Sequence, residues 1–301
     1  MSFDLYFAGA RNKVADDYLL KLGANRLQSQ LLDKNNILIW IKDKSDKSKL
    51  FIDSGAYSAY TKGITISVDN YINYLNSITN KCTIFAQLDT IPGQMGKPKT
   101  KEERLNAPRL SWENYLYMRE RLKEPRKLIP IFHQGENYDW LWNMLEWTDE
   151  NGEHIPYIGI SPAVDVPGLE EFLIQSFDII SRSSNPDVKT HAFGMTQLKM
   201  LELYPYTSAD STSWKLSAAM GSIYTPWGLV YVSDRGAKDR SYIKNYPDAY
   251  EKLLNYLESC EYSFEEVAKY DWARYVVNIK YLMDWAENYE FKGGIKKKKL
   301  F

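Results

Sequence analysis

Short apolar runs and amphipathic stretches alternate along most of the chain. Runs rich in β-branched and aromatic residues predict strands at Phe3–Ala8, Lys49–Asp53, Thr83–Asp89, Leu128–His133, Tyr157–Ser161, Lys189–Phe193, Tyr206–Asp210 and, more weakly, Leu229–Ser233. Most of these runs are apolar throughout rather than strictly alternating. This pattern is typical of parallel strands that are covered on both faces.

Segments with an apolar residue at every third or fourth position lie between the strands and predict helices. They are Asp69–Ile78, Trp112–Leu122, Asp139–Trp147, Leu169–Ile180 and Gln197–Leu203. Repeated alternation of strand and helix predicts a parallel sheet. With eight repeats we expect an α/β fold of the closed TIM (β/α)8 type, and an open doubly wound sheet is the alternative.

The pattern changes after residue 246, where two amphipathic helices, Asp248–Ser259 and Ser263–Tyr289, follow each other without a strand. We expect one domain over residues 1–301: a barrel over about 1–246, C-terminal helices that wrap around it over about 247–290, and a basic tail over 291–301. The tail, which ends in KKKKLF, fits either a solvated terminus or a segment that contacts phosphates.

Composition excludes several classes of protein. The net charge of −1 gives no general basic signature of nucleic-acid binding. The two cysteines, Cys82 and Cys260, are too few for a disulfide framework or a cysteine-rich zinc site. The first residues lack the apolar core of a signal peptide, and no apolar run approaches the ~18 residues of a membrane span. A cytoplasmic location without a membrane partner is therefore expected.

Polar residues follow the predicted strands where each strand ends. Asp53, Asp89 and Asp210 each end one of these strands, and the carboxyl ends of barrel strands carry the active site in this fold. A single aspartate at such a position is often only the cap of the next helix. Three of them at one barrel mouth raise each other's pKa, which favours a chemical role.

The segment Asp53-Ser54-Gly55-Ala56-Tyr57 resembles the Asp-Ser-Gly-Gly-(Phe/Tyr) signature of the tRNA-guanine transglycosylase superfamily. Further segments resemble motifs of that family in the same order: Leu88-Asp89, Phe132-His133-Gln134-Gly135, Tyr157-Ile158-Gly159-Ile160, Ala192-Phe193-Gly194 and Ser208-Ala209-Asp210. The resemblance covers roughly residues 50–215.

The resemblance implies a role for each matched residue. Asp210 would attack C1′ of the target nucleotide, and Asp53 would be the general acid and base. The base-binding residues would be Ser54, Tyr57, Asp89, Gln134, Gly135, Gly159, Phe193 and Gly194, with Tyr57 and Phe193 on the two faces of a guanine-like base. Two carboxylates suit an oxocarbenium-like transition state with a covalent intermediate. His133 and His191 either line the pocket or only pack beside it.

The chain also departs from the family pattern. Ala56 replaces the second glycine, and Ser58 replaces the glutamine that usually follows the aromatic residue. The family's zinc site, with three cysteines and one histidine, cannot be built here, so no metal and no cofactor are expected. In this respect the chain resembles the zinc-free DpdA-type enzymes of phages and bacteria, which insert 7-deazaguanines into DNA. For a phage-encoded enzyme the expected location is the host cytoplasm.

Several basic residues follow the strand Thr83–Asp89. Lys97, Lys99, Lys101, Arg104 and Arg109 lie in a predicted loop, residues 92–110, that would reach the catalytic face and bind phosphates, although a solvated loop is the plainer interpretation. We expect base exchange on DNA, with a 7-deazaguanine such as preQ0 as co-substrate. The alternatives are exchange on tRNA, a nucleosidase or N-glycoside hydrolase, and a degenerate barrel that only binds nucleic acid.

Overall fold

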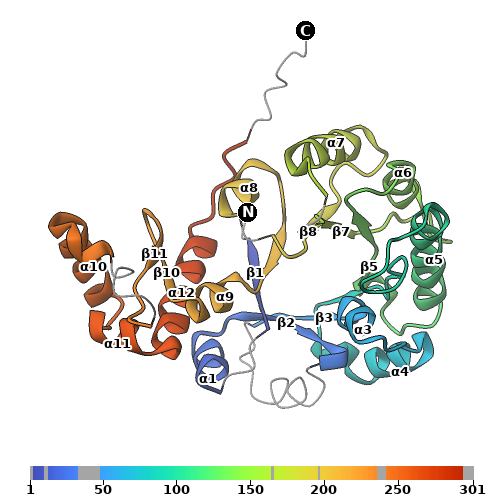
Figure 1. Ribbon diagram of the computed structural model, residues 1–301. Coiled ribbons are helices and arrows are strands. Elements are labelled where there is room, and N and C mark those ends of the chain that lie inside the picture. Colours follow the sequence, from blue (N-terminus) through green and yellow to red (C-terminus); the bar gives the residue numbers. More distant parts are fainter. Residues whose placement is uncertain are drawn as a thin grey trace, which may run out of the picture.

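The computed structural model describes residues 3–9, 13–32, 48–163, 166–195, 197–235 and 242–293 (Figure 1). Within these ranges nine parallel strands form one sheet: β1 Asp4–Ala8, β2 Asn25–Ser29, β3 Leu50–Asp53, β4 Ile84–Ala86, β5 Leu128–Ile129, β6 Ile131–His133, β7 Tyr157–Ser161, β8 Lys189–Ala192 and β9 Ser208–Ser211. Their order is β5-β4-β3-β2-β1-β9-β8-β7-β6. Neighbours in the sheet are thus neighbours along the chain, apart from β1 and β9.

The two ends of this order meet in the chain, because only Pro130 separates β5 from β6. Proline has no N–H to donate to a strand ladder, so the strand is interrupted there. The carbonyl of Pro130 still accepts a hydrogen bond of 2.8 Å from the N–H of Gly159. Since β4 pairs with β5 and β6 pairs with β7, the ring of strands closes through residues 128–133. The predicted TIM-type barrel is confirmed.

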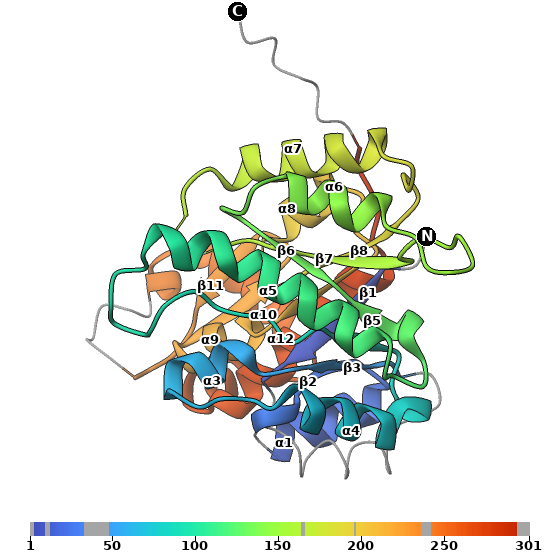
Figure 2. The ribbon, with the colours of Figure 1, turned by 90° about the vertical axis from the view of Figure 1, so that its right-hand side faces the viewer.

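Helices cover the outside of the ring (Figure 2). They are α1 Lys13–Leu22, α3 Ala56–Lys62, α4 Val68–Ile78, α5 Lys101–Arg119, α6 Asp139–Glu146, α7 Leu169–Arg182, α8 Leu198–Leu203 and α9 Ser213–Ala219. In α4 the predicted apolar face is buried: it consists of Tyr71, Ile72, Leu75 and Ile78. The hydroxyl of Ser67 caps this helix by accepting a hydrogen bond from the N–H of Asn70.

The core has two layers, because side chains alternate between the inside of the barrel and the helices. One layer packs the strands against the helices and forms the largest apolar cluster. The other fills the barrel interior with Tyr6, Ala8, Leu27, Phe51, Ile84, Ala86, Ile129 and Ile131. The interior is therefore a packed core, and the open end of the ring is available for a site.

Two predictions about strands were wrong. Strand β2, with the sequence NRLQS, was not predicted because its residues are mostly polar. It fits the barrel because Arg26, buried under the helical layer, forms a 2.5 Å ion pair with Asp16 of α1. The expected eighth strand, Leu229–Ser233, is no part of the barrel. Its first residues belong to β11 Gly228–Tyr231, which forms an antiparallel hairpin with β10 Ser222–Thr225.

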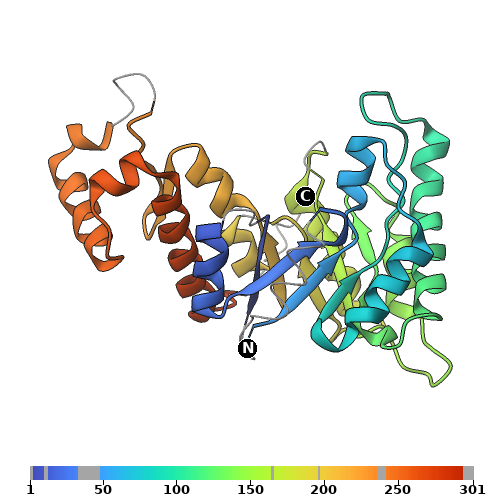
Figure 3. The ribbon, with the colours of Figure 1, turned by 90° about the horizontal axis from the view of Figure 1, so that it is seen from below.

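After the hairpin, the described residues form a short 3-10 helix, Tyr242–Asn245, and three α-helices: α10 Pro247–Ser259, α11 Phe264–Lys269 and α12 Asp271–Glu287. The single helix expected over Ser263–Tyr289 is broken at Tyr270, whose backbone is extended. Helix α12 packs on α1 and α9, whereas α10 and α11 lie to one side of the barrel with their own apolar cluster (Figure 3). Residues 294–301 of the expected basic tail lie outside the described residues. Each helix within the described ranges is too short or too polar to cross a membrane.

One buried side chain joins the C-terminal helices to the barrel. The carbonyl oxygen of Asn278 on α12 accepts a hydrogen bond from the N–H of Tyr224, and its amide donates to the carbonyls of Trp214 and Ser222. Replacing Asn278 by Ala would leave these buried backbone groups without partners.

We predict that Asn278→Ala lowers the free energy of unfolding by about 2–4 kcal/mol, measured by urea denaturation. The matched control is Asn288→Ala at the exposed end of the same helix, where the amide bonds only to its own helix. A loss of similar size in both variants would contradict the role assigned to Asn278.

Candidate active site

Strand β3 ends at Asp53, and the turn that follows fixes its carboxylate. Gly55 adopts a left-handed conformation (φ 81°), and a Cβ there would lie 2.7 Å from the side chains of Leu31 and Ser29. This turn directs the N–H of Gly55 to Asp53 Oδ2 at 2.9 Å. The buried hydroxyl of Ser54 accepts a hydrogen bond from the N–H of Ala56, so this predicted base-binding group stabilises the start of α3.

The carboxyl of Asp53 lies close to two other aspartates of the barrel mouth. Burial is the largest cause that raises its pKa, to about 7, and the charges of Asp210 and Asp89 add to the effect. The hydrogen bond from Gly55 acts in the opposite direction. Asp53 is therefore divided between its acid and its carboxylate form near neutral pH, as a general acid and base requires. The structure brings together all three aspartates that the sequence singled out.

Asp210 lies in β9 and is almost fully buried. Its Oδ1 accepts a hydrogen bond of 2.9 Å from the N–H of Gly194, and it lies 3.3 Å from Nε2 of His191. Gly194 has a left-handed backbone (φ 59°) that turns its N–H toward this oxygen. Within the described ranges no hydrogen bond reaches Oδ2, so one oxygen of the carboxylate is fixed and the other is unengaged.

Asp89 follows β4 and is held by two side chains. Gln87 donates to its Oδ1 at 2.6 Å, and Nε2 of His133 lies 3.3 Å from its Oδ2. The other ring nitrogen of His133 lies 3.2 Å from Glu136. Burial acts to lower the pKa of His133, but the two carboxylates outweigh it and raise this pKa well above its usual value. His133 is thus an imidazolium between two carboxylates at neutral pH.

The segment after β6 differs from what the sequence suggested. Gln134, the predicted base-binding residue, donates to the carbonyls of Val166 and Pro167, and its own carbonyl accepts from the N–H of Ala163. Its amide is thus used to hold the loop after β7. Gly135 has φ 97° in the same turn. The sequence interpretation left the role of His133 open and did not name Glu136 as a residue of the site; counting alternate residues inward from Ile129 and Ile131 indicates that His133 points into the barrel.

Two predicted base-binding residues pack against each other inside the barrel. A Cβ on Gly159 would lie 2.4 Å from the ring of Phe193, so the ring occupies the space that this glycine leaves. Phe193 also contacts the rings of His191 (centroids 4.6 Å apart) and Phe51 (5.6 Å). Tyr57, the expected partner on the other face of a base, is 68% exposed in the first turn of α3.

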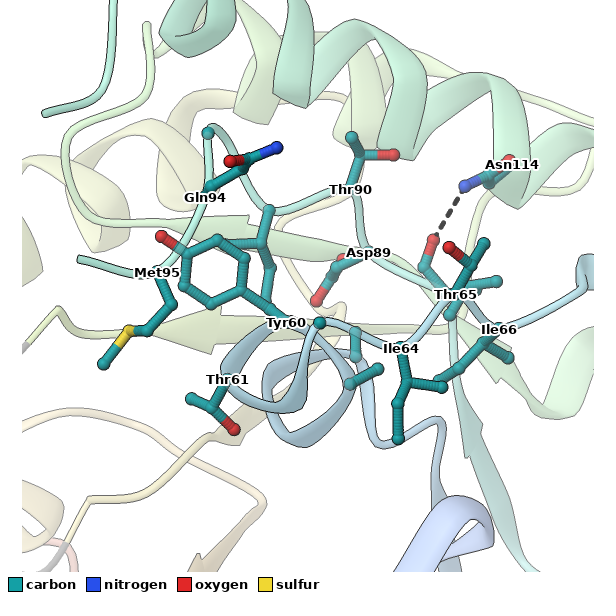
Figure 4. A pocket seen from close by; sticks show the side chains of 16 residues that line it. Tyr60, Thr61, Ile64, Thr65, Ile66, Asp89, Thr90, Gln94, Met95 and Asn114 are labelled. Carbon is teal, nitrogen blue, oxygen red and sulfur yellow. Dashed lines mark hydrogen bonds between the residues drawn. The ribbon is translucent and has the colours of Figure 1, made fainter. Parts of the chain in front are cut away.

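A cavity of about 800 Å³ adjoins the aspartate cluster between α3 and the chain that follows β4. Of the three aspartates, Asp89 lines this cavity, and its carboxylate points into it (Figure 4). The wall is partly apolar, with Tyr60, Ile64, Ile66 and Met95, and partly polar, with Thr61, Thr65, Thr90 and Gln94. Asn114 of α5 fixes the chain at its edge by donating to the carbonyl of Leu88 at 3.0 Å. The cavity can therefore take a ligand that has both apolar and polar surface.

The predicted basic loop over residues 92–110 is only partly a loop. Helix α5 begins at Lys101 with a capping box between Thr100 and Glu103, which the sequence interpretation overlooked. Lys97 is exposed and Lys99 partly exposed in the loop, whereas Lys101, Arg104 and Arg109 are exposed on the helix. Arg109 forms a 2.5 Å ion pair with Glu113. The other four basic groups remain candidates for phosphate contacts.

No protein-family model matches the chain, and no curated protein sequence matches it. Among the described residues, no group of three or more histidine, cysteine or acidic side chains has an arrangement that could hold a metal ion.

The raised pKa of Asp53 predicts a pH dependence of stability. Its folded-state pKa of about 7 exceeds the ordinary 3.8, so folding favours the protonated form. The free energy of unfolding of the wild type, relative to that of Asp53→Asn, should therefore fall by at most about 4 kcal/mol as pH rises from about 4 to about 7. Above pH 7 the difference should stay constant. Urea denaturation of both proteins across this range measures the difference. An exposed control, Asp187→Asn, should show no such trend.

Proposed function

We propose that the protein exchanges guanine in a polynucleotide for a 7-deazaguanine such as preQ0, through a covalent bond between Asp210 and C1′ of the nucleotide. The observation that carries this proposal is the pairing of Asp53, with a pKa near 7, and Asp210, with one fixed and one free carboxylate oxygen. Two such carboxylates at one barrel mouth suit cleavage of a glycosidic bond by double displacement. The resemblance to the transglycosylase motifs supports the same chemistry.

In the first half of the proposed reaction, Oδ2 of Asp210 attacks C1′ while the bond from C1′ to N9 of guanine breaks. The bonding electrons leave with the base, and the carboxylic acid of Asp53 gives it a proton. In the second half, the Asp53 carboxylate takes the N9 proton of the incoming base. That nitrogen then attacks C1′ and releases Asp210. Each half inverts the configuration at C1′, so the exchange retains it overall.

The pair of Asp89 and His133 offers a means of selecting guanine. Guanine presents an acceptor, O6, beside a donor, N1–H, whereas adenine presents a donor beside an acceptor. The cationic His133 and the Asp89 acceptor lie side by side, with 3.3 Å between Nε2 and Oδ2. Both ring hydrogens of His133 are directed at carboxylates, so His133 holds Asp89 in place. The remaining lone pairs of the Asp89 carboxylate would accept from N1–H of guanine, whereas adenine presents only an acceptor, N1, at that position. The base must leave its stack to reach them.

DNA is proposed as the polynucleotide in preference to tRNA. This preference is supported by the lack of the zinc ligands that the tRNA enzymes of the family carry. The two cysteines of the chain, Cys82 and Cys260, are instead buried in two separate apolar clusters. Lys97, Lys99, Lys101 and Arg104 follow the cavity wall in sequence and could contact a phosphate backbone.

The nucleophile is tested by Asp210→Asn, a near-isosteric change. We expect the variant to fold but to form no covalent protein–DNA adduct, because a carboxamide is a poor nucleophile. The adduct of the wild type is to be measured by denaturing electrophoresis and mass spectrometry in the absence of incoming base. Asp187→Asn serves as the control for loss of an exposed carboxylate. An adduct with Asp210→Asn in normal amount would show that another residue attacks.

The substrate is tested with guanine-containing DNA, matched tRNA and free guanosine, each with radiolabelled base. Release from DNA, with incorporation of preQ0, is the expected result. Turnover of tRNA alone would make RNA the substrate, and turnover of guanosine alone would indicate a nucleosidase.

Binding to DNA should weaken as salt concentration rises, because phosphate contacts release counterions. Changing Lys97, Lys99, Lys101 and Arg104 to Gln should reduce the slope of log affinity against log salt by about one per lost contact. The same change at Lys123 and Arg126, which precede β5 at the opposite end of the barrel, is the control. An unchanged slope in the first variant would place the DNA elsewhere.

A further inference from the structure

A chain of hydrogen bonds runs through the barrel interior beneath Asp210. Tyr157 on β7 lies with its hydroxyl 2.5 Å from Oγ of Ser208, and the same Oγ lies 2.5 Å from Nδ1 of His191. Nε2 of His191 then faces Oδ1 of Asp210 at 3.3 Å. The four side chains come from three adjacent strands, β7, β8 and β9, and all point into the barrel.

Asp210, at the end of this series of hydrogen bonds, fixes the direction of every donor in the series. An ionised Asp210 can only accept, so Nε2 of His191 must carry a hydrogen. A neutral imidazole then has a lone pair on Nδ1, so the hydroxyl of Ser208 must donate its hydrogen to that nitrogen. Because the Ser208 hydroxyl donates its only hydrogen to His191, it must accept a hydrogen bond from the hydroxyl of Tyr157. All donors therefore point toward Asp210.

The surroundings of His191 favour its neutral form. The ring is completely buried, and the rings of Tyr6, Phe51 and Phe193 stand edge-on around it. Burial is the largest influence on its pKa, which it lowers, although Asp210 acts in the opposite direction. The titratable groups that face this ring are Asp210, Tyr6 and, through Ser208, Tyr157. Burial holds the pKa of both tyrosines well above the usual value, so neither is charged near neutral pH.

We propose that Tyr157, Ser208 and His191 form a directional relay that positions Asp210 for attack. The relay holds Oδ1 together with the N–H of Gly194 and leaves Oδ2 free toward the substrate. His191 is a positioning residue here, since it acts on the nucleophile and touches no substrate. This inference rests on the proposed function for its catalytic meaning, while the hydrogen-bond directions can be tested without any reaction.

The first test determines the tautomer of His191 by NMR of protein labelled with ¹⁵N in its three histidines. At pH 7 the relay requires a neutral ring with hydrogen on Nε2. Ser208→Ala removes the donor to Nδ1 but leaves Asp210 in place, so the ring should keep its hydrogen on Nε2 while the ¹⁵N resonance of the unprotonated Nδ1 shifts. Ser176→Ala, which removes a buried serine hydroxyl on α7, should leave the ring unchanged. A wild-type ring with hydrogen on Nδ1, or an imidazolium at pH 7, would overturn the relay.

The second test compares two amides in place of His191. The amide nitrogen of Gln reaches the position of Nε2 and can still donate to Asp210, whereas that of Asn reaches only the position of Nδ1, beside Ser208. We expect His191→Gln to keep adduct formation with saturating DNA within about tenfold of the wild type, and His191→Asn to lose about a hundredfold. Thermal melting of both variants checks that they fold. The two variants are matched, because each places a carboxamide in the buried position of the imidazole.

The pH profile separates positioning from a merely structural role. In His191→Asn the charged form of Asp210 loses one of its two donors, so the acid limb of the rate should move to higher pH, while in His191→Gln it should stay. Equal losses and unshifted limbs in both folded variants would overturn the proposal. A wild type with the required tautomer but no base exchange on any polynucleotide would instead overturn the proposed function and leave the relay as a feature of the barrel.

Discussion

Three carboxylates crowded at the open end of a closed barrel are the constraint on which this site depends. Asp53, Asp89 and Asp210 repel one another, and the chain offsets the repulsion with fixed donors. Two come from glycine turns, Gly55 and Gly194, whose left-handed backbones aim an N–H at a carboxylate. The remaining repulsion appears in the pKa of Asp53. One carboxyl thus holds a proton near neutral pH while another is held ready as a base or a nucleophile.

The packed interior of the barrel supports these carboxylates from below. Gly159 leaves room for the ring of Phe193, and this ring helps to enclose His191. A buried and neutral His191 can in turn direct a hydrogen to Asp210. Packing and electrostatics are therefore coupled at this point: the ring of Phe193 helps to bury His191, and burial lowers the pKa of the imidazole.

The two histidines at the barrel mouth show how surroundings assign different roles to one side chain. His133 lies between Asp89 and Glu136 and is cationic, because two carboxylates outweigh its burial. His191 meets a single carboxylate within an aromatic enclosure and is neutral. Both ring hydrogens of the cationic His133 are therefore directed at carboxylates, whereas the neutral His191 can offer a single donor to Asp210. Since a TIM-type barrel hosts many reactions, such details carry more functional information than the fold itself.

The sequence alone determined the barrel and the positions of the three aspartates. Apolar strands buried on both faces leave a strong local signal, and a residue at a strand end has a fixed place in a parallel barrel. Strand β2 escaped this reasoning because its buried Arg26 is compensated by Asp16, a partner ten residues away. A contact of this kind cannot be read from local hydrophobicity.

Only the tertiary structure decided which side chains enter the site. Gln134 and His133 are adjacent in the sequence, but β6 ends at His133 and Gln134 lies in the turn that follows. His133 therefore meets Asp89, while Gln134 holds a loop. The relay to Asp210 likewise joins residues of three strands that are up to 53 positions apart, Tyr157 and Asp210. The sequence therefore located the acidic groups, while closure of the barrel decided their partners, because hydrogen bonds and pKa values depend on neighbours in space.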